Sequence, residues 1–66
     1  MYRNARAEMV RAGLKLENVA EAMDLTISTL SQKLNGKYPF TLNEAKLFKK
    51  IVKSELPIEI LFEEAS

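Results

Sequence analysis

Chemically reactive side chains are few in this chain of 66 residues, which contains neither histidine nor cysteine. Their absence excludes disulfide bonds, zinc sites built on thiolate or imidazole, and catalytic pairs of the Cys–His or Ser–His kind. Paired carboxylates remain, because Glu17/Glu21 and Glu59/Glu63 are spaced i,i+4, but we expect both pairs on exposed helix faces without a pocket. We therefore predict that the protein is not an enzyme and uses no metal, no cofactor and no small-molecule substrate.

The composition is that of one small globular domain spanning residues 1–66. Hydrophobic residues make up 47% and charged residues 29% of the chain, which is enough for a core and unlike a disordered segment. No apolar run approaches the roughly 18 residues of a membrane helix. The N-terminal region carries Arg3, Arg6 and Glu8 and lacks the apolar segment of a signal peptide. The predicted location is the cytoplasm, away from membranes.

The net charge of +1 conceals an uneven distribution along the chain. Residues 1–53 contain all ten Lys and Arg residues and carry a net charge of +5, whereas residues 54–66 carry −4. Such polarity suits a molecule with one face turned to a polyanion and the acidic end turned away. An ordinary solvated surface can show the same split.

Hydrophobic periodicity predicts five helices and no strand, which makes the fold class all-α. The first three are expected over Tyr2–Ala12, Leu16–Met23 and Ile27–Leu34. Gly13 and Asn35-Gly36 end the first and third of these helices, and Thr26 is a good N-cap for the third. The fifth is a short helix that Ser54 caps, with Pro57 in its first turn.

The fourth helix has the clearest start signal in the chain. Thr41-Leu42-Asn43-Glu44 matches a capping box, in which the Thr hydroxyl and the Glu carboxylate each accept a hydrogen bond from a free backbone N–H. The helix is expected to bury Leu42, Ala45, Phe48, Ile51 and Val52. Its lysines, Lys46, Lys49, Lys50 and Lys53, are interpreted as a solvated face rather than as a DNA contact.

The second and third helices are separated by a turn of only three or four residues, so they must cross steeply, as in a helix-turn-helix. The segment Leu16–Lys37 resembles the helix-turn-helix of the Cro/C1-type phage repressor family. The features that match are Val19-Ala20, Leu25, Leu30, Asn35-Gly36-Lys37 and the start of the fourth helix at Thr41–Glu44. This resemblance covers nearly the whole chain and implies a five-helix, lambda-repressor-like DNA-binding bundle with its helix-turn-helix at about residues 16–35.

Three positions depart from the family pattern. Asp24 replaces the glycine that is usual in the turn, and Leu16 stands where the family often has a glutamine that reaches a phosphate. Lys33 stands where the family often buries an aliphatic residue or a tryptophan, and Leu34 is expected to take the inward position instead.

The resemblance also implies the residues that would touch DNA. The base-reading positions fall on Ile27, Ser28, Thr29 and Gln32, and the phosphate-contacting candidates are Lys15, Lys33, Asn35, Lys37 and Tyr38. A glutamine can pair with the N6/N7 edge of adenine, and Ser or Thr can donate or accept at either base edge. The alternatives are that Ser28 and Thr29 serve the start of the helix and that Ile27 belongs to the core.

The function that the resemblance implies is sequence-specific binding of double-stranded DNA by a phage-type transcriptional regulator, a repressor or a Cro-like protein, with helix 27–34 in the major groove. One such helix reads few base pairs, so we expect a homodimer on the operator. Ile58, Leu61 and Phe62 are predicted to form the dimer surface, because with Ile60 they exceed one buried stripe. The alternative is that all four pack within the chain. The alternative function is a protein–protein interaction module, such as an antitoxin or antirepressor, built on the same fold.

Overall fold

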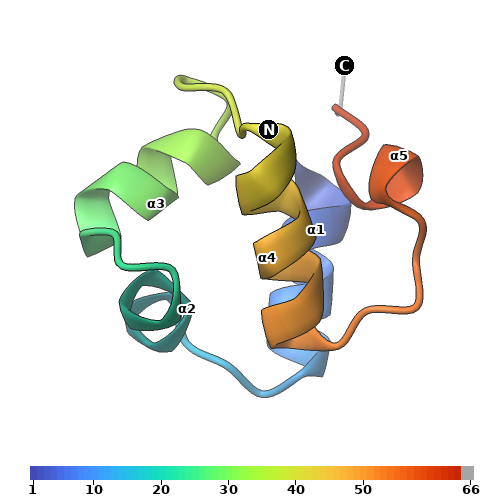
Figure 1. Cartoon of the computed structure of the whole chain (residues 1–66), viewed down its shortest axis with the longest axis horizontal. Coiled ribbons are helices and arrows are strands. Elements are labelled where there is room, and N and C mark those ends of the chain that lie inside the picture. The colour runs from blue at the N-terminus through green and yellow to red at the C-terminus, as the bar shows by residue number, and fades with distance from the viewer. Residues whose placement is uncertain (65–66) are drawn as a thin grey trace.

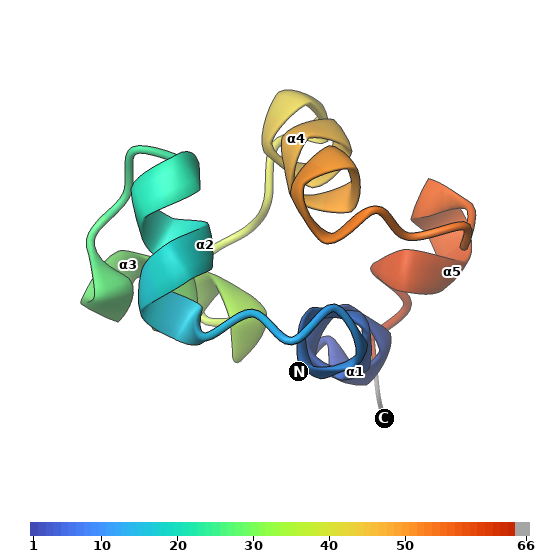
Figure 2. The same cartoon turned by 90° about the horizontal axis from the view of Figure 1, so that it is seen from below.

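The computed structural model describes residues 1–64, and within that range it contains five α-helices and no strand. They are α1 (Arg3–Arg11), α2 (Leu16–Ala22), α3 (Ile27–Leu34), α4 (Leu42–Val52) and α5 (Ile58–Leu61). The prediction of an all-α, five-helix bundle is confirmed. Figures 1 and 2 show α1 and α4 in the middle of the molecule, with the α2–α3 pair on one side and α5 on the other.

One hydrophobic core connects all five helices. The largest fully buried side chains are Phe48, Leu30, Leu34, Leu61, Val19 and Val52. Ala20 in α2 is 1% exposed, and its small side chain lets α3 approach α2 closely. Because Leu30 and Leu34 point inward from α3, the opposite face of that helix is left at the surface.

The first four helices are each followed by a residue with positive φ: Gly13 (71°), Asp24 (57°), Gly36 (85°) and Lys53 (54°). After α3, the Lys37 N–H donates to the Gln32 carbonyl (2.9 Å) and the Gly36 N–H donates to the Lys33 carbonyl (3.1 Å). This pair of bonds is a Schellman motif, which closes a helix C-terminus and usually has glycine at the left-handed position. The predicted helix ends at Gly13 and Gly36 are confirmed, whereas Lys53 had no sequence signal.

The link between α4 and α5 differs from its prediction. Ser54 is buried, and its hydroxyl donates to Glu8 Oε1 (2.5 Å) and accepts from the Leu56 N–H (3.1 Å), so it does not cap α5. Pro57 is the N-cap of α5, one position before the first turn. The prediction of a Ser54 cap with Pro57 inside the helix is wrong, because Ser54 is instead bound by α1.

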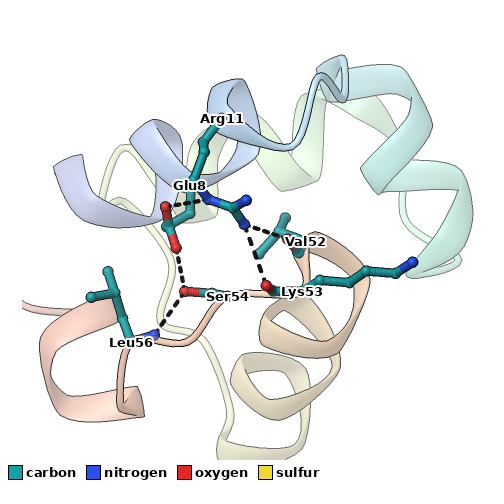
Figure 3. Close-up of polar contacts among 6 residues, drawn as sticks. All are labelled: Glu8, Arg11, Val52, Lys53, Ser54 and Leu56. Atoms are coloured by element: carbon teal, nitrogen blue, oxygen red, sulfur yellow. Dashed lines mark hydrogen bonds and ion pairs between the residues drawn. The ribbon is translucent and has the colours of Figure 1, made fainter.

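Arg11 completes this link from the side of α1. Its Nε donates to Glu8 Oε2 (2.8 Å), and its Nη2 donates to the carbonyls of Val52 (2.8 Å) and Lys53 (3.3 Å), as Figure 3 shows. We call this set the Glu8–Arg11–Ser54 network. Hydrogen bonds from Ser54 and Arg11 lower the pKa of the Glu8 carboxyl below its ordinary value. The network holds the last two turns of α1 against the end of α4.

A cluster of four aromatic rings fills the space between α1, α4 and α5. Phe62 lies at its centre, with ring centroids 4.7 Å from Phe40, 5.5 Å from Tyr2 and 5.6 Å from Phe48. The contacts of Phe62 with Tyr2 and Phe48 are edge-to-face, and such aromatic pairs stabilise beyond the area they bury. Phe62 is thus bound within its own chain.

This packing corrects the predicted dimer surface. Leu61 is fully buried in the core, so it is not available to a second copy, and Phe62 belongs to the aromatic cluster. The prediction of a dimer contact at Leu61 is therefore wrong, whereas that at Phe62, which is half-buried, stays a prediction. Ile58 is half-buried, and Ile60 is 42% exposed and turned to solvent.

The expected buried face of α4 is confirmed at Ala45, Phe48 and Val52 and is wrong at Leu42, which is 62% exposed. Leu42 is the first residue of α4, and Phe40 rather than Leu42 turns into the aromatic cluster.

None of the helices in residues 1–64 combines the length and apolar character that a membrane crossing requires.

Candidate nucleic-acid interface

The turn between α2 and α3 is as short as the sequence predicts. Asp24 N–H donates to the Glu21 carbonyl (3.1 Å) and Leu25 N–H donates to the Ala20 carbonyl (2.8 Å), so α2 also ends in a Schellman motif. Asp24 occupies the left-handed position at φ 57°, where a side chain costs about 1 kcal/mol relative to glycine. In Figure 1, α2 is seen nearly end-on while α3 lies across the view, so the two helices cross steeply.

Thr26 caps the start of α3, as predicted. Its hydroxyl accepts from the Thr29 N–H (3.1 Å) and donates to Thr29 Oγ1 (2.8 Å). Thr29, a predicted base contact, is half-buried and already has this local partner. In the free protein the Thr29 hydroxyl therefore takes part in the N-cap of α3. This agrees with one of the two interpretations of the sequence.

The exposed face of α3 carries the other three predicted base contacts. Ile27 is 50% exposed, Ser28 is exposed and Gln32 is half-buried. Within residues 1–64 the hydroxyl of Ser28 and the amide of Gln32 have no hydrogen-bond partner, so both are available to an external ligand. None of these three side chains is charged, and Ser and Gln side chains can hydrogen-bond to base edges.

Lys33 is turned into the molecule, which corrects its predicted role as a phosphate contact. Its Nζ donates to Glu44 Oε1 (3.0 Å) and to the Pro39 carbonyl (3.0 Å), and its side chain is only 14% exposed. The fully buried Leu34 takes the inward position, as expected, and this rotation directs Lys33 toward the start of α4. Lys33 thus ties α3 to α4.

Glu44, which accepts the hydrogen bond from Lys33, also caps the start of α4. Its Oε1 accepts from the Thr41 N–H (3.0 Å), and Thr41 Oγ1 accepts from the Glu44 N–H (3.1 Å), so the predicted capping box is confirmed. The bond from the Thr41 backbone, with Lys33 as a further cause, lowers the pKa of the Glu44 carboxyl. The ionised carboxylate links the start of α4 to the end of α3.

The remaining phosphate candidates are at the surface. Lys15 is the N-cap of α2, where its N–H donates to Asn18 Oδ1 (2.9 Å), and its side chain is exposed. Asn35, Lys37 and Tyr38 follow one another after α3, all exposed. Gly36 lies between them with φ 85°, and a Cβ there would come within 3.2 Å of the Met1 nitrogen. The structure thus brings three of the predicted residues together at the C-terminal end of α3.

Sequence reasoning missed one residue at this end of the molecule. Arg6 in α1 donates from Nη2 to Asn35 Oδ1 (2.8 Å), while its Nε is buried without a hydrogen-bond partner in residues 1–64. A buried unpaired donor costs about 1–3 kcal/mol. The two residues are 29 positions apart, so no local pattern could have connected them.

A surface depression lies at the other end. It has a volume of about 380 Å³ and is lined by Glu8, Arg11, Lys53, Glu55 and Leu56. Glu8 and Arg11 are hydrogen-bonded to each other there, so the depression belongs to the Glu8–Arg11–Ser54 network. In residues 1–64 no group of His, Cys, Asp or Glu side chains could hold a metal ion.

No protein-family model, curated protein sequence or solved structure matches this chain. A function is therefore inferred from the residues of the chain and from their arrangement.

Proposed function

We propose that the protein is a sequence-specific, double-stranded DNA-binding regulator of the Cro/C1-type helix-turn-helix kind, which reads the major groove with α3. The observation that carries the proposal is the outer face of α3, where Ile27, Ser28 and Gln32 are accessible and uncharged. An eight-residue helix is about 12 Å long, and the major groove is about 12 Å wide. A helix of this size with short polar side chains suits contact with base edges.

The positions of the basic groups support the same proposal. Lys37 is exposed directly beyond α3, and Lys15 is exposed at the start of α2. Lysines at the margins of an uncharged helix face would bind phosphates while the helix between them reads bases. The acidic residues of the C-terminal segment, Glu55, Glu59, Glu63 and Glu64, all follow α4 in the sequence.

Binding as a homodimer, through a surface that does not include Leu61, is part of the proposal because one α3 spans few base pairs.

A protein–protein interaction module is the second candidate. The observation in its favour is that Leu42 and Leu47 of α4 are 62% and 40% exposed. An interaction surface on α3 itself would need apolar side chains there, and Ile27 is the one large apolar residue on its accessible face. The arrangement favours DNA.

The proposal is tested by selecting duplexes from a random pool and measuring affinity for the enriched sequence over a series of salt concentrations. With about four to six phosphate contacts or more per dimer, log K should fall with log[salt] at a slope of about −4 or steeper. Lys37→Ala should flatten that slope by about 1 per subunit. Lys46→Ala is the matched control, because it removes the same charge from the exposed face of α4, and its slope should equal that of the unaltered protein.

An unenriched pool, or an affinity that does not change with salt, would contradict DNA binding. Sedimentation of the protein with the enriched duplex gives the number of copies bound. Two copies are expected on a site with two half-sites about one helical turn apart.

A further inference from the structure

Arg6 fixes the orientation of the Asn35 side chain. A guanidinium group has only donors, so the atom of the Asn35 amide that faces it must be the acceptor, Oδ1. The bond from Arg6 Nη2 to Asn35 Oδ1 is 2.8 Å long. The other end of a planar amide carries the two donor hydrogens of Nδ2. Because Asn35 is exposed, that end is available to an acceptor outside the protein.

Further contacts show that α1 and the end of α3 are held together at this point. Tyr2 N–H donates to the Leu34 carbonyl (3.0 Å), and Gly36 comes so close to Met1 that a Cβ would meet its nitrogen at 3.2 Å. The backbone on both sides of the Arg6–Asn35 bond is therefore fixed. The amide is attached to a rigid helix end rather than to a free loop.

The position of Arg6 also lowers the stability of the folded protein. Its Nε is buried and has no hydrogen-bond partner in residues 1–64. A donor left unpaired in this way lowers stability, so stability alone does not account for an arginine at this position. A role in which the guanidinium organises a neighbouring group does account for it.

We propose that Arg6 is a positioning residue, which holds the Asn35 amide with Nδ2 facing outward so that it donates a hydrogen bond to a DNA phosphate. Phosphate oxygens only accept hydrogen bonds, so an amide in the opposite orientation would present its oxygen to them and repel them. The inference rests on the proposed function. It adds α1 to the elements that build the DNA-contacting surface.

The first test is made without DNA. In 15N relaxation measurements the side-chain NH₂ of Asn35 should be nearly as ordered as the helical backbone, for which order parameters are about 0.85. In Arg6→Met, which keeps the packing of the side chain and removes its donors, the order parameter should fall below about 0.6. An Asn35 amide that is equally mobile in both proteins would overturn the proposal.

The second test measures affinity for the selected duplex at 0.15 M salt. Arg6→Met should weaken binding about tenfold. Arg3→Met is the matched control, because Arg3 is exposed on the same helix, and its loss should stay below about twofold. In a protein that already carries Asn35→Ala, Arg6→Met should change affinity by no more than Arg3→Met does, because the group that Arg6 positions is gone.

Equal effects of Arg6→Met and Arg3→Met would overturn the positioning role while leaving DNA binding intact. A tenfold loss that persists in the Asn35→Ala background would overturn it too, since Arg6 would then act without Asn35. No binding by the unaltered protein would overturn both proposals. If Arg6→Met does not fold, Arg6→Lys replaces it, because lysine keeps the charge but lacks the planar fork. In Arg6→Lys the order parameter of the Asn35 amide should lie between those of a rigid and a free side chain. If the Asn35 amide of the unaltered protein is already as mobile as a free side chain, the proposal is contradicted.

Discussion

Arg6 and Arg11 lie on the same helix, five residues apart, and their guanidinium groups are used in different ways. Arg11 donates to Glu8 and to the carbonyls of Val52 and Lys53, so its bonds connect α1 with the end of α4. Arg6 donates to one exposed amide, Asn35, beside the predicted DNA-contacting face. The α5 end of the molecule uses its polar groups to hold the fold together, whereas the α3 end leaves polar groups at the surface.

The difference extends to the apolar residues. Around α5, Leu61 is fully buried and Phe62 is in contact with three other aromatic rings. On α3, Leu30 and Leu34 face the core, and the remaining face is accessible. We infer that substitutions at the α5 end reduce stability, and that substitutions on the outer face of α3 reduce binding.

The largest expected effect is at Leu61. Leu61→Ala should destabilise the protein by about 2–5 kcal/mol, because it removes a fully buried side chain and leaves a cavity. Ile60→Ala is the neighbouring control, and since Ile60 is 42% exposed its effect should stay within about 0.5 kcal/mol. Urea unfolding followed by circular dichroism measures both. Similar losses for the two variants would mean that α5 does not contribute to the core as described.

The next effect separates two serines. Ser54→Ala should cost about 1 kcal/mol of stability, because the buried hydroxyl bonds both Glu8 and the Leu56 N–H. Ser28→Ala, on the outer face of α3, should change stability by less than about 0.5 kcal/mol. DNA affinity should respond in the opposite way, with a loss for Ser28→Ala and none for Ser54→Ala. If either substitution reduced both stability and DNA affinity, the proposed division between the α5 end and the outer face of α3 would be contradicted.

A smaller effect concerns pH. The pKa values of Glu8 and Glu44 are lowered in the folded protein, so the unfolded chain binds more protons in the acidic range. The stability that these carboxylates contribute is present above their ordinary pKa of 4.5 and is lost as the pH falls through the lowered values. Thermal midpoints should be level above about pH 5 and should decline below it. Glu8→Gln should make the decline shallower, and an unchanged decline would contradict the role of the network.

Local signals in the sequence predict the helices and most of their ends. The caps at Thr26 and Thr41 and the terminators Gly13 and Gly36 act within a few residues of where they stand, so a short window of sequence contains all the information. The same holds for the accessible face of α3, which follows from the spacing of Leu30 and Leu34. These parts were predicted correctly because their causes are local.

The errors arise where residues distant in sequence meet. Lys33 pairs with Glu44 11 positions away, and Ser54 bonds Glu8 46 positions away, so neither partner could be inferred from its neighbours. α5 has only four residues, too few for periodicity to show which face is buried. Its orientation depends on the aromatic cluster, which combines Phe48 of α4 with residues just outside the helices: Tyr2, Phe40 and Phe62. Leu61 was therefore assigned to the wrong surface.

The central claim is that α3 reads bases, and Gln32→Ala tests it most directly. Affinity for the selected duplex and for unrelated duplex DNA is measured at one fixed salt concentration, with Asn43→Ala, an exposed amide on α4, as the control. Gln32→Ala should cost about 1–3 kcal/mol per half-site on the selected duplex and little on unrelated DNA, because the phosphate contacts remain. The thermal midpoint should stay nearly unchanged. Equal losses on both duplexes, or none on either, would contradict base reading by α3.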